Sequence, residues 1–474
     1  MPVDLSRFVK AYDVRGLVPD ELDTRVAYAI GAAFADVVAL ADGAPAVVVG
    51  HDMRPSSPEL SQAFADGVGA AGVDTILVGL VSTDELYYAS GALDAPGAMF
   101  TASHNPAAYN GIKLCRSAAR PVGQDSGLGE IRDLAQAMLD GATEPMTATV
   151  PGVISRRDVL ADYARFLRSL VDLRGGRPLR VVVDAANGMA GLTAPAVLGT
   201  AAGLEPLPLE LVPLYFDLDG TFPNHEANPL DPANLVDLQA AVVEHGADLG
   251  LAFDGDADRC FVVDERGAAV SPSAITALIA EREVGKAVAS GTPVADVRIV
   301  HNVITSRTVP ELVRDLGAEP VRTRVGHSFI KAEMARTAAV FGGEHSAHYY
   351  FRDFWFADTG MLAALHVLAA LGEQEGPLSR LASAYERYAA SGEVNSTVAD
   401  VHAATERVRG YAADRGATVD ELDGLTVSDA EGQWWFNVRP SNTEPLLRLN
   451  VEASDGAVMA QVRDDVLAIV RGTP

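Results

Sequence analysis

The chain has few cysteines, few basic residues and no long apolar run. Cys115 and Cys260 are the only cysteines among 474 residues, and neither belongs to a C-x-x-C pair. A disulfide framework and a structural zinc site are therefore not expected. No uninterrupted run of about 18 apolar residues occurs, and Met1–Lys10 lacks the apolar core of a signal peptide. We expect a cytoplasmic protein that does not associate with membranes.

Basic residues number 37 against 64 acidic ones, which gives a net charge of -27. Nucleic acid is therefore not an expected partner, because binding a phosphate backbone requires a basic surface. A phosphorylated small substrate would also be repelled, unless the site gathers its few Lys, Arg and His side chains locally. The hydrophobic share of 48% is that of an ordinary globular protein, and the length predicts about three or four domains.

Three segments share one pattern, in which a short β-branched run leads into a polar turn and then into a helical pattern. They begin at Ala46–Val49, Leu179–Val183 and Val297–Val300. Such a pattern is typical of a β-α unit with a buried, parallel strand. The spacing predicts three similar α/β domains in tandem.

The last part of the chain differs. Trp434–Val438 and Leu447–Val451 are predicted strands joined by the loop Arg439–Pro445, and a helix is expected over Gly456–Arg471. This pattern predicts a smaller α+β domain. Breaker-rich segments place the domains at residues 1–150, 151–267, 268–380 and 381–474.

Phosphate-binding glycine loops of the usual nucleotide-binding kinds are not predicted. Gly67–Gly72 matches G-x-G-x-x-G, but a helical pattern precedes it and a strand follows, which reverses the order that dinucleotide binding requires. We interpret it as the end of a helix packed close to a sheet. No G-x-x-x-x-G-K-[ST] string is present.

Two short strings carry most of the chemical information. Thr101–Pro106 places the Ser103 hydroxyl beside an imidazole in a polar turn, and Asp254–Arg259 sets three carboxylates at alternate positions. Alternate positions in an extended segment would put the carboxylates on one side. Three hard oxygen ligands can hold a divalent cation, which a phosphoserine needs for phosphoryl transfer. An EF-hand is not expected, because Arg259 occupies the sixth position, where that loop needs glycine.

Two further loops offer polar groups. Gly343–His348 contains a carboxylate, a hydroxyl and two imidazoles. A zinc site on His345 and His348 is conceivable, but no further ligand has a fitting spacing, so we favour contacts to sugar hydroxyls. Arg439–Thr443 combines a fork-shaped cation with hydroxyls and an amide, which suits a phosphate monoester.

These strings together resemble those of the α-D-phosphohexomutases, in particular the bacterial phosphomannomutase/phosphoglucomutase branch. The resemblance covers essentially the whole chain in the family's order. It implies a fold of four domains around a central cleft, three similar α/β domains and a smaller C-terminal α+β domain. The segments that resemble those of the family are the N-terminal segment Ala11–Gly16, the phosphoserine loop Thr101–Pro106, the magnesium loop Asp254–Arg259, the sugar loop Gly343–His348 and the phosphate loop Arg439–Thr443.

The resemblance also implies roles for individual residues. The implied catalytic residues are Ser103, the phosphoryl carrier, with His104, Arg15, Lys113 and Arg259. The implied ligands of Mg²⁺ are Ser103, Asp254, Asp256 and Asp258. The implied substrate-binding residues are Tyr12, His327, Glu344, Ser346, His348, Arg439, Ser441, Asn442 and Thr443.

The implied reaction interconverts mannose 1-phosphate and mannose 6-phosphate through a phosphoserine, with a hexose 1,6-bisphosphate as intermediate and activator. Open alternatives are a phosphoglucomutase or dual-specificity enzyme, a magnesium-dependent sugar phosphatase, and a non-catalytic sugar-phosphate sensor. The expected partners are small hexose phosphates, and the expected state is a monomer or weak homo-oligomer.

The chain departs from the family pattern at two places. His345 and Ala347 stand where the sugar loop usually has Met and Gly, and Ile304 stands where a lysine is frequent. Arg307 and Arg298 are the cations near Ile304 in the sequence.

Overall fold

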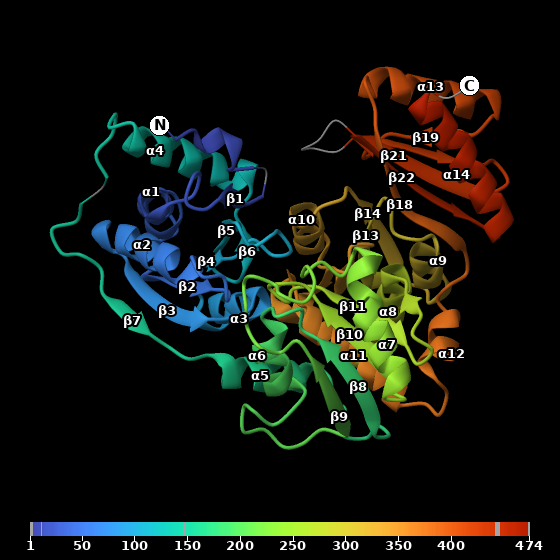
Figure 1. Ribbon diagram of the computed structural model, residues 1–474, viewed down its shortest axis with the longest axis horizontal. Coiled ribbons are helices and arrows are strands. Elements are labelled where there is room, and N and C mark those ends of the chain that lie inside the picture. The colour runs from blue at the N-terminus through green and yellow to red at the C-terminus, as the bar shows by residue number, and fades with distance from the viewer. Residues whose placement is uncertain (1–2, 11, 146, 441–445, 473–474) are drawn as a thin grey trace. The chain divides into compact units, whose positions relative to one another are not determined.

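The computed structural model describes residues 3–10, 12–145, 147–440 and 446–472, without the side chain of residue 125. Four β-sheets and the helices that cover them account for most of these residues (Figure 1). The chain divides into two compact units. The first comprises Met1–Val270 and Ser346–Ser379, and the second comprises Ser271–His345 and Arg380–Pro474. Within the described part of the chain, no helix has both the length and the apolarity needed to span a bilayer.

The first sheet has the order β1-β5-β4-β2-β3-β7, with β6 paired to β5. Strand β2 lies parallel to β3 and β4, whereas β5 runs antiparallel to β4 and β1. The strands are β1 (Val14–Leu17), β2 (Ala46–His51), β3 (Asp74–Leu80), β4 (Gly97–Phe100), β5 (Tyr109–Arg116), β6 (Arg120–Pro121) and β7 (Ile154–Arg156). Because β7 pairs with β3, this sheet extends past the boundary predicted at residue 150.

Helices cover both faces of the first sheet. Val47 and Val49 of β2 pack into one core and Val48 into another, as the alternation of side chains along a strand requires. The first core includes residues of α1, α2 and α4, and the second includes residues of α3 (Figure 1). The helices are α1 (Thr24–Phe34), α2 (Ser57–Ala70), α3 (Thr83–Leu93) and α4 (Leu128–Leu139).

The glycines Gly67 and Gly69 lie inside α2, as the sequence predicted, but Gly67 faces a helix rather than the sheet. A Cβ atom on Gly67 would clash with the carbonyl oxygen of Tyr28 in α1, and a Cβ on Gly31 would clash with that of Phe64 in α2. The two glycines thus allow a close helix–helix contact.

The second sheet has the order β12-β11-β10-β8-β9, with β8 parallel to β9 and β10. Its elements, with the helices beside them, are β8 (Leu179–Asp184), β9 (Leu209–Leu214), β10 (Leu249–Phe253), β11 (Cys260–Asp264), β12 (Ala269–Val270), α5 (Leu160–Leu170), α6 (Ala190–Val197) and α7 (Val236–Glu244). The predicted boundary at residue 267 falls in the turn between the paired strands β11 and β12.

The first unit also contains a hairpin of β16 (Tyr349–Phe351) and β17 (Ala357–Asp358), followed by α11 (Gly360–Gly372). Helix α11 packs on β11, α5 and α6. The segment predicted as one third domain, residues 268–380, is therefore shared between the two units.

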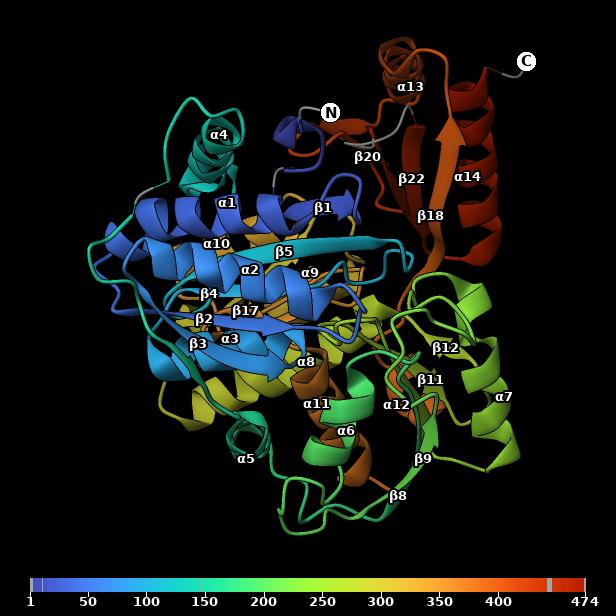
Figure 2. The ribbon, with the colours of Figure 1, turned by 60° about the vertical axis from the view of Figure 1, so that its left-hand side comes forward.

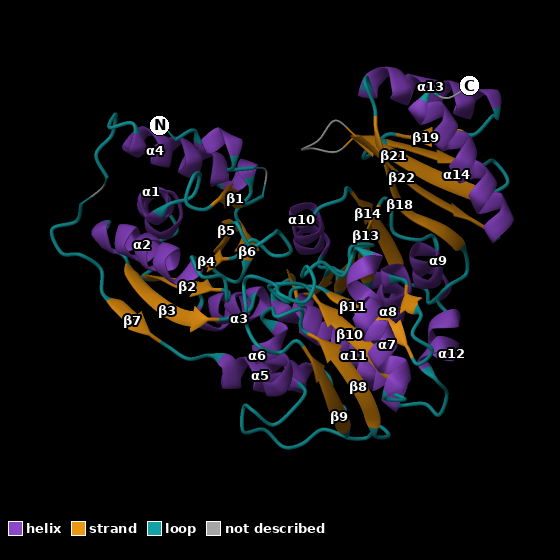
Figure 3. Cartoon of the chain, in the orientation of Figure 1, coloured by secondary structure: helices purple, strands orange, loops and turns teal. Residues whose placement is uncertain are grey.

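The second unit contains a parallel arrangement β14-β13-β15 and a separate antiparallel sheet β18-β22-β21-β20-β19. Helix α14 runs along β18 and β22 (Figures 2 and 3). The elements are β13 (Arg298–Asn302), β14 (Glu319–Thr323), β15 (Phe341–Gly343), β18 (Ala389–Thr397), β19 (Thr418–Asp420), β20 (Leu425–Ser428), β21 (Trp434–Pro440), β22 (Leu446–Ala453), α8 (Pro272–Ala289), α9 (Thr308–Asp315), α10 (His327–Thr337), α12 (Leu378–Ser383, which crosses the unit boundary), α13 (Val401–Asp414) and α14 (Gly456–Arg471).

The strands β2, β8 and β13 occupy equivalent places, because each lies between two parallel neighbours. The predicted fold class, three α/β domains and a smaller α+β domain, is confirmed. In such sheets ligands bind beyond the carboxyl ends of the strands, where the strand order changes direction. The polar turns found in the sequence begin at these ends.

Candidate active site

The Ser103 loop leaves the carboxyl end of β4. Ser103 is buried and adopts a left-handed backbone conformation with a φ of 49°. Its N–H donates to Oγ1 of Thr101 at 2.9 Å. A non-glycine residue with positive φ needs support from its surroundings, and this hydrogen bond supplies part of it.

The Asp254–Asp258 segment follows β10 and forms a tight turn, not the extended segment that alternate positions suggested. Ala257 has a φ of 62°, and its N–H donates to the carbonyl of Asp254 at 3.1 Å. The turn itself therefore gathers the three carboxylates, which each offer an oxygen within 4.8 Å of the others.

The serine loop and the acidic turn are in direct contact. Oγ of Ser103 donates to Oδ2 of Asp254 at 2.7 Å. A Cβ atom on Gly255 would clash with the carbonyl oxygen of Ser103, so the turn needs glycine there to come this close.

The acidic turn fits a divalent cation. Nζ of Lys113 bridges Oδ2 of Asp256 and Oδ2 of Asp258 at 2.6 Å each. The two remaining oxygens, Oδ1 of Asp256 and Oδ1 of Asp258, are buried and accept no hydrogen bond from the described part of the chain. Burial, and after it the charge of the neighbouring Asp256 carboxylate, raise the pKa of Asp258. Hard carboxylate oxygens that lack donors suit Mg²⁺.

Arg259 and His104 complete the surroundings of the serine hydroxyl. Arg259 donates to Oδ2 of Asp254 from Nε at 2.9 Å and from Nη2 at 2.8 Å, and Nη2 also donates to Nδ1 of His104 at 2.6 Å. Burial and the charges of Arg259 and Arg15 hold the pKa of His104 well below its ordinary value. The imidazole is therefore neutral, with Nδ1 as an acceptor.

Arg15 reaches the same loop from β1. Its Nε donates to Asp13 at 2.9 Å and its Nη1 donates to Oδ1 of Asn105 at 2.6 Å. The Asp13 carboxylate raises the pKa of Arg15. Arg15 therefore keeps its positive charge. Tyr12, which is close to Arg15 in the sequence, is half-buried.

Part of the predicted sugar loop belongs to the first unit. Oγ of Ser346 lies 3.0 Å from Nδ1 of His348, and Nε2 of His348 lies 3.7 Å from Oδ1 of Asp258. Asp358 completes this group, since its carboxylate, that of Asp258 and the His348 ring lie within 4.8 Å of one another. The structure thus brings His348 to the acidic turn.

The other part belongs to the second unit. Glu344 is buried, and its Oε1 accepts from the N–H of Gly326 at 3.3 Å, next to His327 at the start of α10. His345 has a buried Nδ1 without a hydrogen-bond partner. Burial and the charges of Arg439 and Arg448 lower its pKa to about 3, so it is neutral.

Arg439 lies in strand β21, not in the loop that the sequence predicted. It stands opposite Arg448 of β22. Two guanidinium groups placed opposite one another repel, but Glu393 separates them with salt bridges of 2.9 Å to each. Nε of each arginine is buried and finds no acceptor among the residues that the structure describes. Ser441, Asn442 and Thr443, predicted to bind phosphate beside Arg439, lie outside the described residues.

The two cations near Ile304 are both engaged elsewhere. Arg298 begins β13, at the end of the strand opposite to Ile304, and pairs with Glu319 at 2.9 Å. Arg307 donates from Nη1 to the carbonyl of Gly432 at 2.9 Å. Ile304 itself is buried.

Comparison with known proteins identifies the family of the chain. The phosphoglucomutase/phosphomannomutase models for α/β/α domains I, II and III match residues 6–138, 161–267 and 271–388, and the C-terminal domain model matches residues 393–469. The chain belongs to the phosphoglucomutase/phosphomannomutase family. It is an enzyme, an isomerase of the phosphohexomutase type, as the resemblance implied.

Individual family members are similar along their whole length. A protein of Xanthomonas campestris described as phosphohexose mutases is 42% identical over 467 residues, which cover 98% of this chain and 99% of that protein. A phosphomannomutase of Salmonella typhimurium is 40% identical and covers 97% of both chains. The crystal structure of a phosphoglucomutase/phosphomannomutase family protein from Burkholderia thailandensis has a TM-score of 0.85 at 34% identity, with 99% of this chain and 97% of that one covered.

Several residues of the candidate site were not found from the sequence. Thr83, at the start of α3, donates from Oγ1 to Oδ2 of Asp256 at 2.6 Å. Arg448 and Glu393 surround Arg439, and Asp358 joins His348. Arg54 lies in the polar turn after β2. That turn, at the carboxyl end of a central strand, was the one signal available for Arg54.

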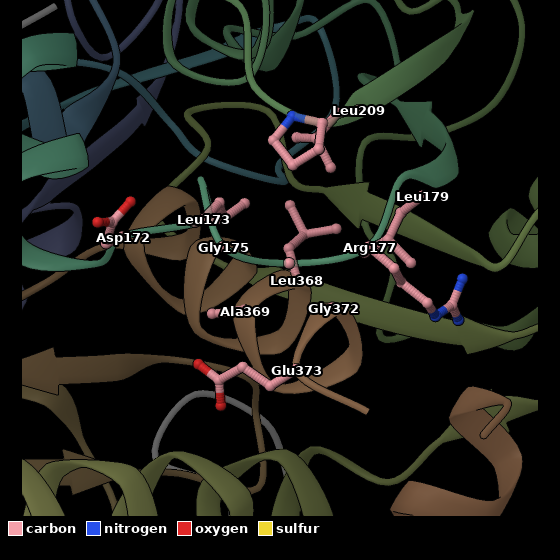
Figure 4. Close-up of a pocket in the computed structure, with 12 residues that line it drawn as sticks. Asp172, Leu173, Gly175, Arg177, Leu179, Leu209, Leu368, Ala369, Gly372 and Glu373 are labelled. Atoms are coloured by element: carbon pink, nitrogen blue, oxygen red, sulfur yellow. The ribbon is translucent and has the colours of Figure 1, made fainter. Parts of the chain in front are cut away.

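A cavity of about 150 Å³ lies away from these groups in the first unit (Figure 4). Leu179 and Leu209, which begin β8 and β9, line it together with Leu368 and Ala369 of α11. It therefore lies at the amino ends of these parallel strands, whereas Asp184 and the acidic turn lie at the carboxyl ends. We assign no part of the chemistry to this cavity.

Proposed function

We propose that the enzyme interconverts mannose 1-phosphate and mannose 6-phosphate, with Ser103 as the phosphoryl carrier and a hexose 1,6-bisphosphate as intermediate and activator. The contact of 2.7 Å between Oγ of Ser103 and Oδ2 of Asp254 carries this proposal. It joins the hydroxyl next to His104 to the carboxylates that can hold a cation. The similarity to a phosphomannomutase favours mannose.

In the first half of the cycle, a hydroxyl oxygen of the sugar attacks the phosphorus on Ser103. The new P–O bond forms as the bond between phosphorus and Oγ breaks, so the sugar carries two phosphates. The sugar hydroxyl loses its proton, and Oγ gains one. The reverse transfer, after the bisphosphate has reoriented, moves the other phosphate to Ser103.

The residues around Ser103 suit this transfer. Arg259, Lys113 and Arg15 are cations that stabilise charge spread over the phosphoryl oxygens. Nδ1 of the neutral His104 lies 3.2 Å from Oγ, so His104 is the group we propose to assist the proton transfer. Arg15 stays charged, which suits charge stabilisation better than proton transfer.

We propose that Asp254, Asp256 and Asp258 hold Mg²⁺, together with Ser103. The two carboxylate oxygens without donors support this assignment. When bound, the cation supplies positive charge that polarises the phosphoryl group. Lys113 keeps the other oxygens of Asp256 and Asp258 fixed.

The remaining predicted residues are proposed to bind the sugar and its second phosphate. Glu344, Ser346 and His348 offer hydrogen bonds to hydroxyls, and Tyr12 and His327 are further polar groups that the family resemblance implies. The free Nε of Arg439 supports a phosphate contact, because a guanidinium binds phosphate with parallel donors. Ser441, Asn442 and Thr443 would add hydroxyl and amide donors.

A coupled assay tests the proposal. Turnover is measured with mannose 1-phosphate, glucose 1-phosphate and glucosamine 1-phosphate, each with a bisphosphate primer and Mg²⁺. We expect the highest kcat/KM with mannose 1-phosphate. Equal rates with glucose 1-phosphate would make it a dual-specificity enzyme, steady release of inorganic phosphate would make it a phosphatase, and binding without turnover would make it a sensor.

A further inference from the structure

Arg54 is a fully buried arginine whose role is not explained by a contact to substrate or metal. It is 1% exposed and lies in the turn that follows β2, where its Nε donates to Oδ2 of Asp52 at 3.2 Å. The side chains of both partners are completely buried. A buried ion pair of this kind contributes little net stability, since both charges lose their hydration. Net stability alone therefore does not account for this ion pair.

The explanation lies in what the guanidinium group binds. Its Nη1 donates to the carbonyls of Pro106 and Tyr109 at 2.9 Å each, and its Nη2 donates to those of Ser103 at 2.9 Å and Asn105 at 2.7 Å. With the bond from Nε, all five N–H groups of the guanidinium are used. Four of the five reach the backbone of one short loop, residues 103–109. Lysine has only three donors and could not replace this pattern.

The loop bound by Arg54 is the one that presents the carrier hydroxyl. Holding the Ser103 carbonyl fixes the orientation of the left-handed residue, and hence the direction of its side chain toward Asp254. The Asn105 carbonyl is held in the same way, and the Asn105 side chain accepts from Arg15. Arg54 thus supports two groups of the site without touching either functional side chain.

A second strained segment packs against Arg54. The ring of Phe222 lies 5.2 Å from the guanidinium carbon, a cation–π contact. Phe222 has a φ of 52°, which is unusual for a bulky residue. A Cβ atom on the neighbouring Gly220 would lie 2.6 Å from Cα of Arg54, so this loop packs tightly on the turn. Such strain persists where the surroundings fix a conformation that function requires.

We propose that Arg54 is a positioning residue for phosphoryl transfer, which fixes the backbone of residues 103–109 so that the Ser103 hydroxyl points at the acidic turn. This inference rests on the proposed role of Ser103 as carrier. It assigns Arg54 no contact with sugar, phosphate or metal. Arg54 should therefore affect kcat rather than KM.

The test compares Arg54→Lys with Arg168→Lys. Arg168 is a matched control, because it also donates to three backbone carbonyls, those of Val197, Gly199 and Glu205, but lies outside the site. A displacement of about 1 Å in a reacting group can cost about 100-fold in rate. We expect Arg54→Lys to lower kcat by about that factor with KM nearly unchanged, and Arg168→Lys to leave kcat unchanged. A kcat for Arg54→Lys within twofold of the wild type would overturn the proposal.

Two measurements distinguish the proposed positioning role of Arg54 from a purely structural role: chemical rescue of kcat, and the rate at which Ser103 is phosphorylated. Arg54→Ala should regain part of its kcat when millimolar guanidinium chloride is added, and not with sodium chloride. Mass spectrometry after incubation with a hexose bisphosphate should show slow phosphorylation of Ser103 in Arg54→Lys. Normal loading of that variant would contradict the inference, whereas a wild type that never carries phosphate on Ser103 would instead contradict the proposed function.

If the Arg54 variants do not fold, Asp52→Asn provides a second test of the same inference. It keeps the volume of the side chain but removes the charge that fixes Nε of Arg54. An intermediate loss of kcat at constant KM is expected. An unchanged kcat in a folded Asp52→Asn protein would count against the inference.

Discussion

Oγ of Ser103 donates to Oδ2 of Asp254 at 2.7 Å, although 151 positions separate the two residues in sequence. Each residue follows the carboxyl end of a strand, β4 in one sheet and β10 in another. The contact therefore depends on two domains of the first unit and on the glycine that lets the two backbones approach. It also places a hydroxyl, a carboxylate and the guanidinium of Arg259 together, an arrangement that fits the proposed phosphoryl transfer.

Removal of the carrier hydroxyl should abolish mutase turnover. Ser103→Ala leaves Asp254 with its bonds from Arg259, so the acidic turn and the fold should persist. Mass spectrometry of the wild type after incubation with a hexose bisphosphate should locate the phosphate on Ser103. Ser117→Ala, in the turn between β5 and β6, is the control and should keep full turnover. Phosphate found consistently on another residue would refute the assignment of Ser103.

Loss of one carboxylate should weaken binding of Mg²⁺. Asp256→Asn replaces a ligand but keeps an oxygen that can accept from Lys113, so the turn should stay folded. We expect the Mg²⁺ concentration for half-maximal activity to rise by at least about tenfold. Titration of activity with Mg²⁺ and calorimetric binding of Mg²⁺ check this, with Asp172→Asn, an exposed carboxylate elsewhere, as control. Full activity in the presence of a strong chelator would exclude the metal.

A buried histidine in the second unit should make that unit sensitive to acid. Burial lowers the pKa of His301 to about 4, with further lowering by Arg322 and Arg314. Between pH 6.5 and pH 4 the unfolded chain binds a proton at this position that the folded chain does not, so stability falls as the pH falls. From pH 7 to pH 5 this amounts to about 2 kcal/mol.

His301→Gln, which is neutral at every pH, should remove this contribution. Hydrogen exchange of peptides that cover β13, measured at pH 7 and pH 5 and corrected for intrinsic rates, should show a smaller loss of protection in the variant. His402, exposed on α13, gives the control variant His402→Gln. If wild type and His301→Gln lose protection equally, His301 does not carry the acid sensitivity.

The fold could be predicted largely from local patterns. The β-branched runs that become β2, β8 and β13, and the helix Gly456–Arg471, were found at nearly their observed bounds, because buried strands and amphipathic helices have distinct periods. The domain boundaries were harder. Strand β7 adds to the first sheet and Ser346–Ser379 belongs to the first unit, and both depend on pairing between distant segments.

The residues of the candidate site could be predicted where several reactive side chains lie close together in the sequence. The Ser103 and Asp254–Asp258 strings were found, but the acidic turn was taken for an extended segment, because the left-handed Ala257 gives no signal in sequence. Arg54 was not recognised, since its partners are backbone carbonyls, which every residue has. Arg448 and Glu393 were missed because only the register of β18, β21 and β22 brings them to Arg439.

Conservative replacement of Arg439 should weaken binding of the phosphate that is not transferred. Arginine can offer two parallel donors to phosphate oxygens, whereas lysine offers a point charge. In Arg439→Lys the Glu393 carboxylate would also hold the ammonium more closely and compete with the phosphate. Loss of one hydrogen bond to a charged group costs about 1.5 kcal/mol or more, so KM should rise by at least about tenfold.

Both mannose 1-phosphate and mannose 6-phosphate should be affected, because in either orientation the distal phosphate is proposed to bind here. Loading of Ser103 from the bisphosphate should suffer less than substrate affinity. Arg387→Lys, at an exposed arginine that pairs with Asp315, is the matched control in the same unit. Steady-state kinetics in both directions decide the matter. A rise in KM for one substrate only would show that the two orientations do not share a phosphate site at Arg439.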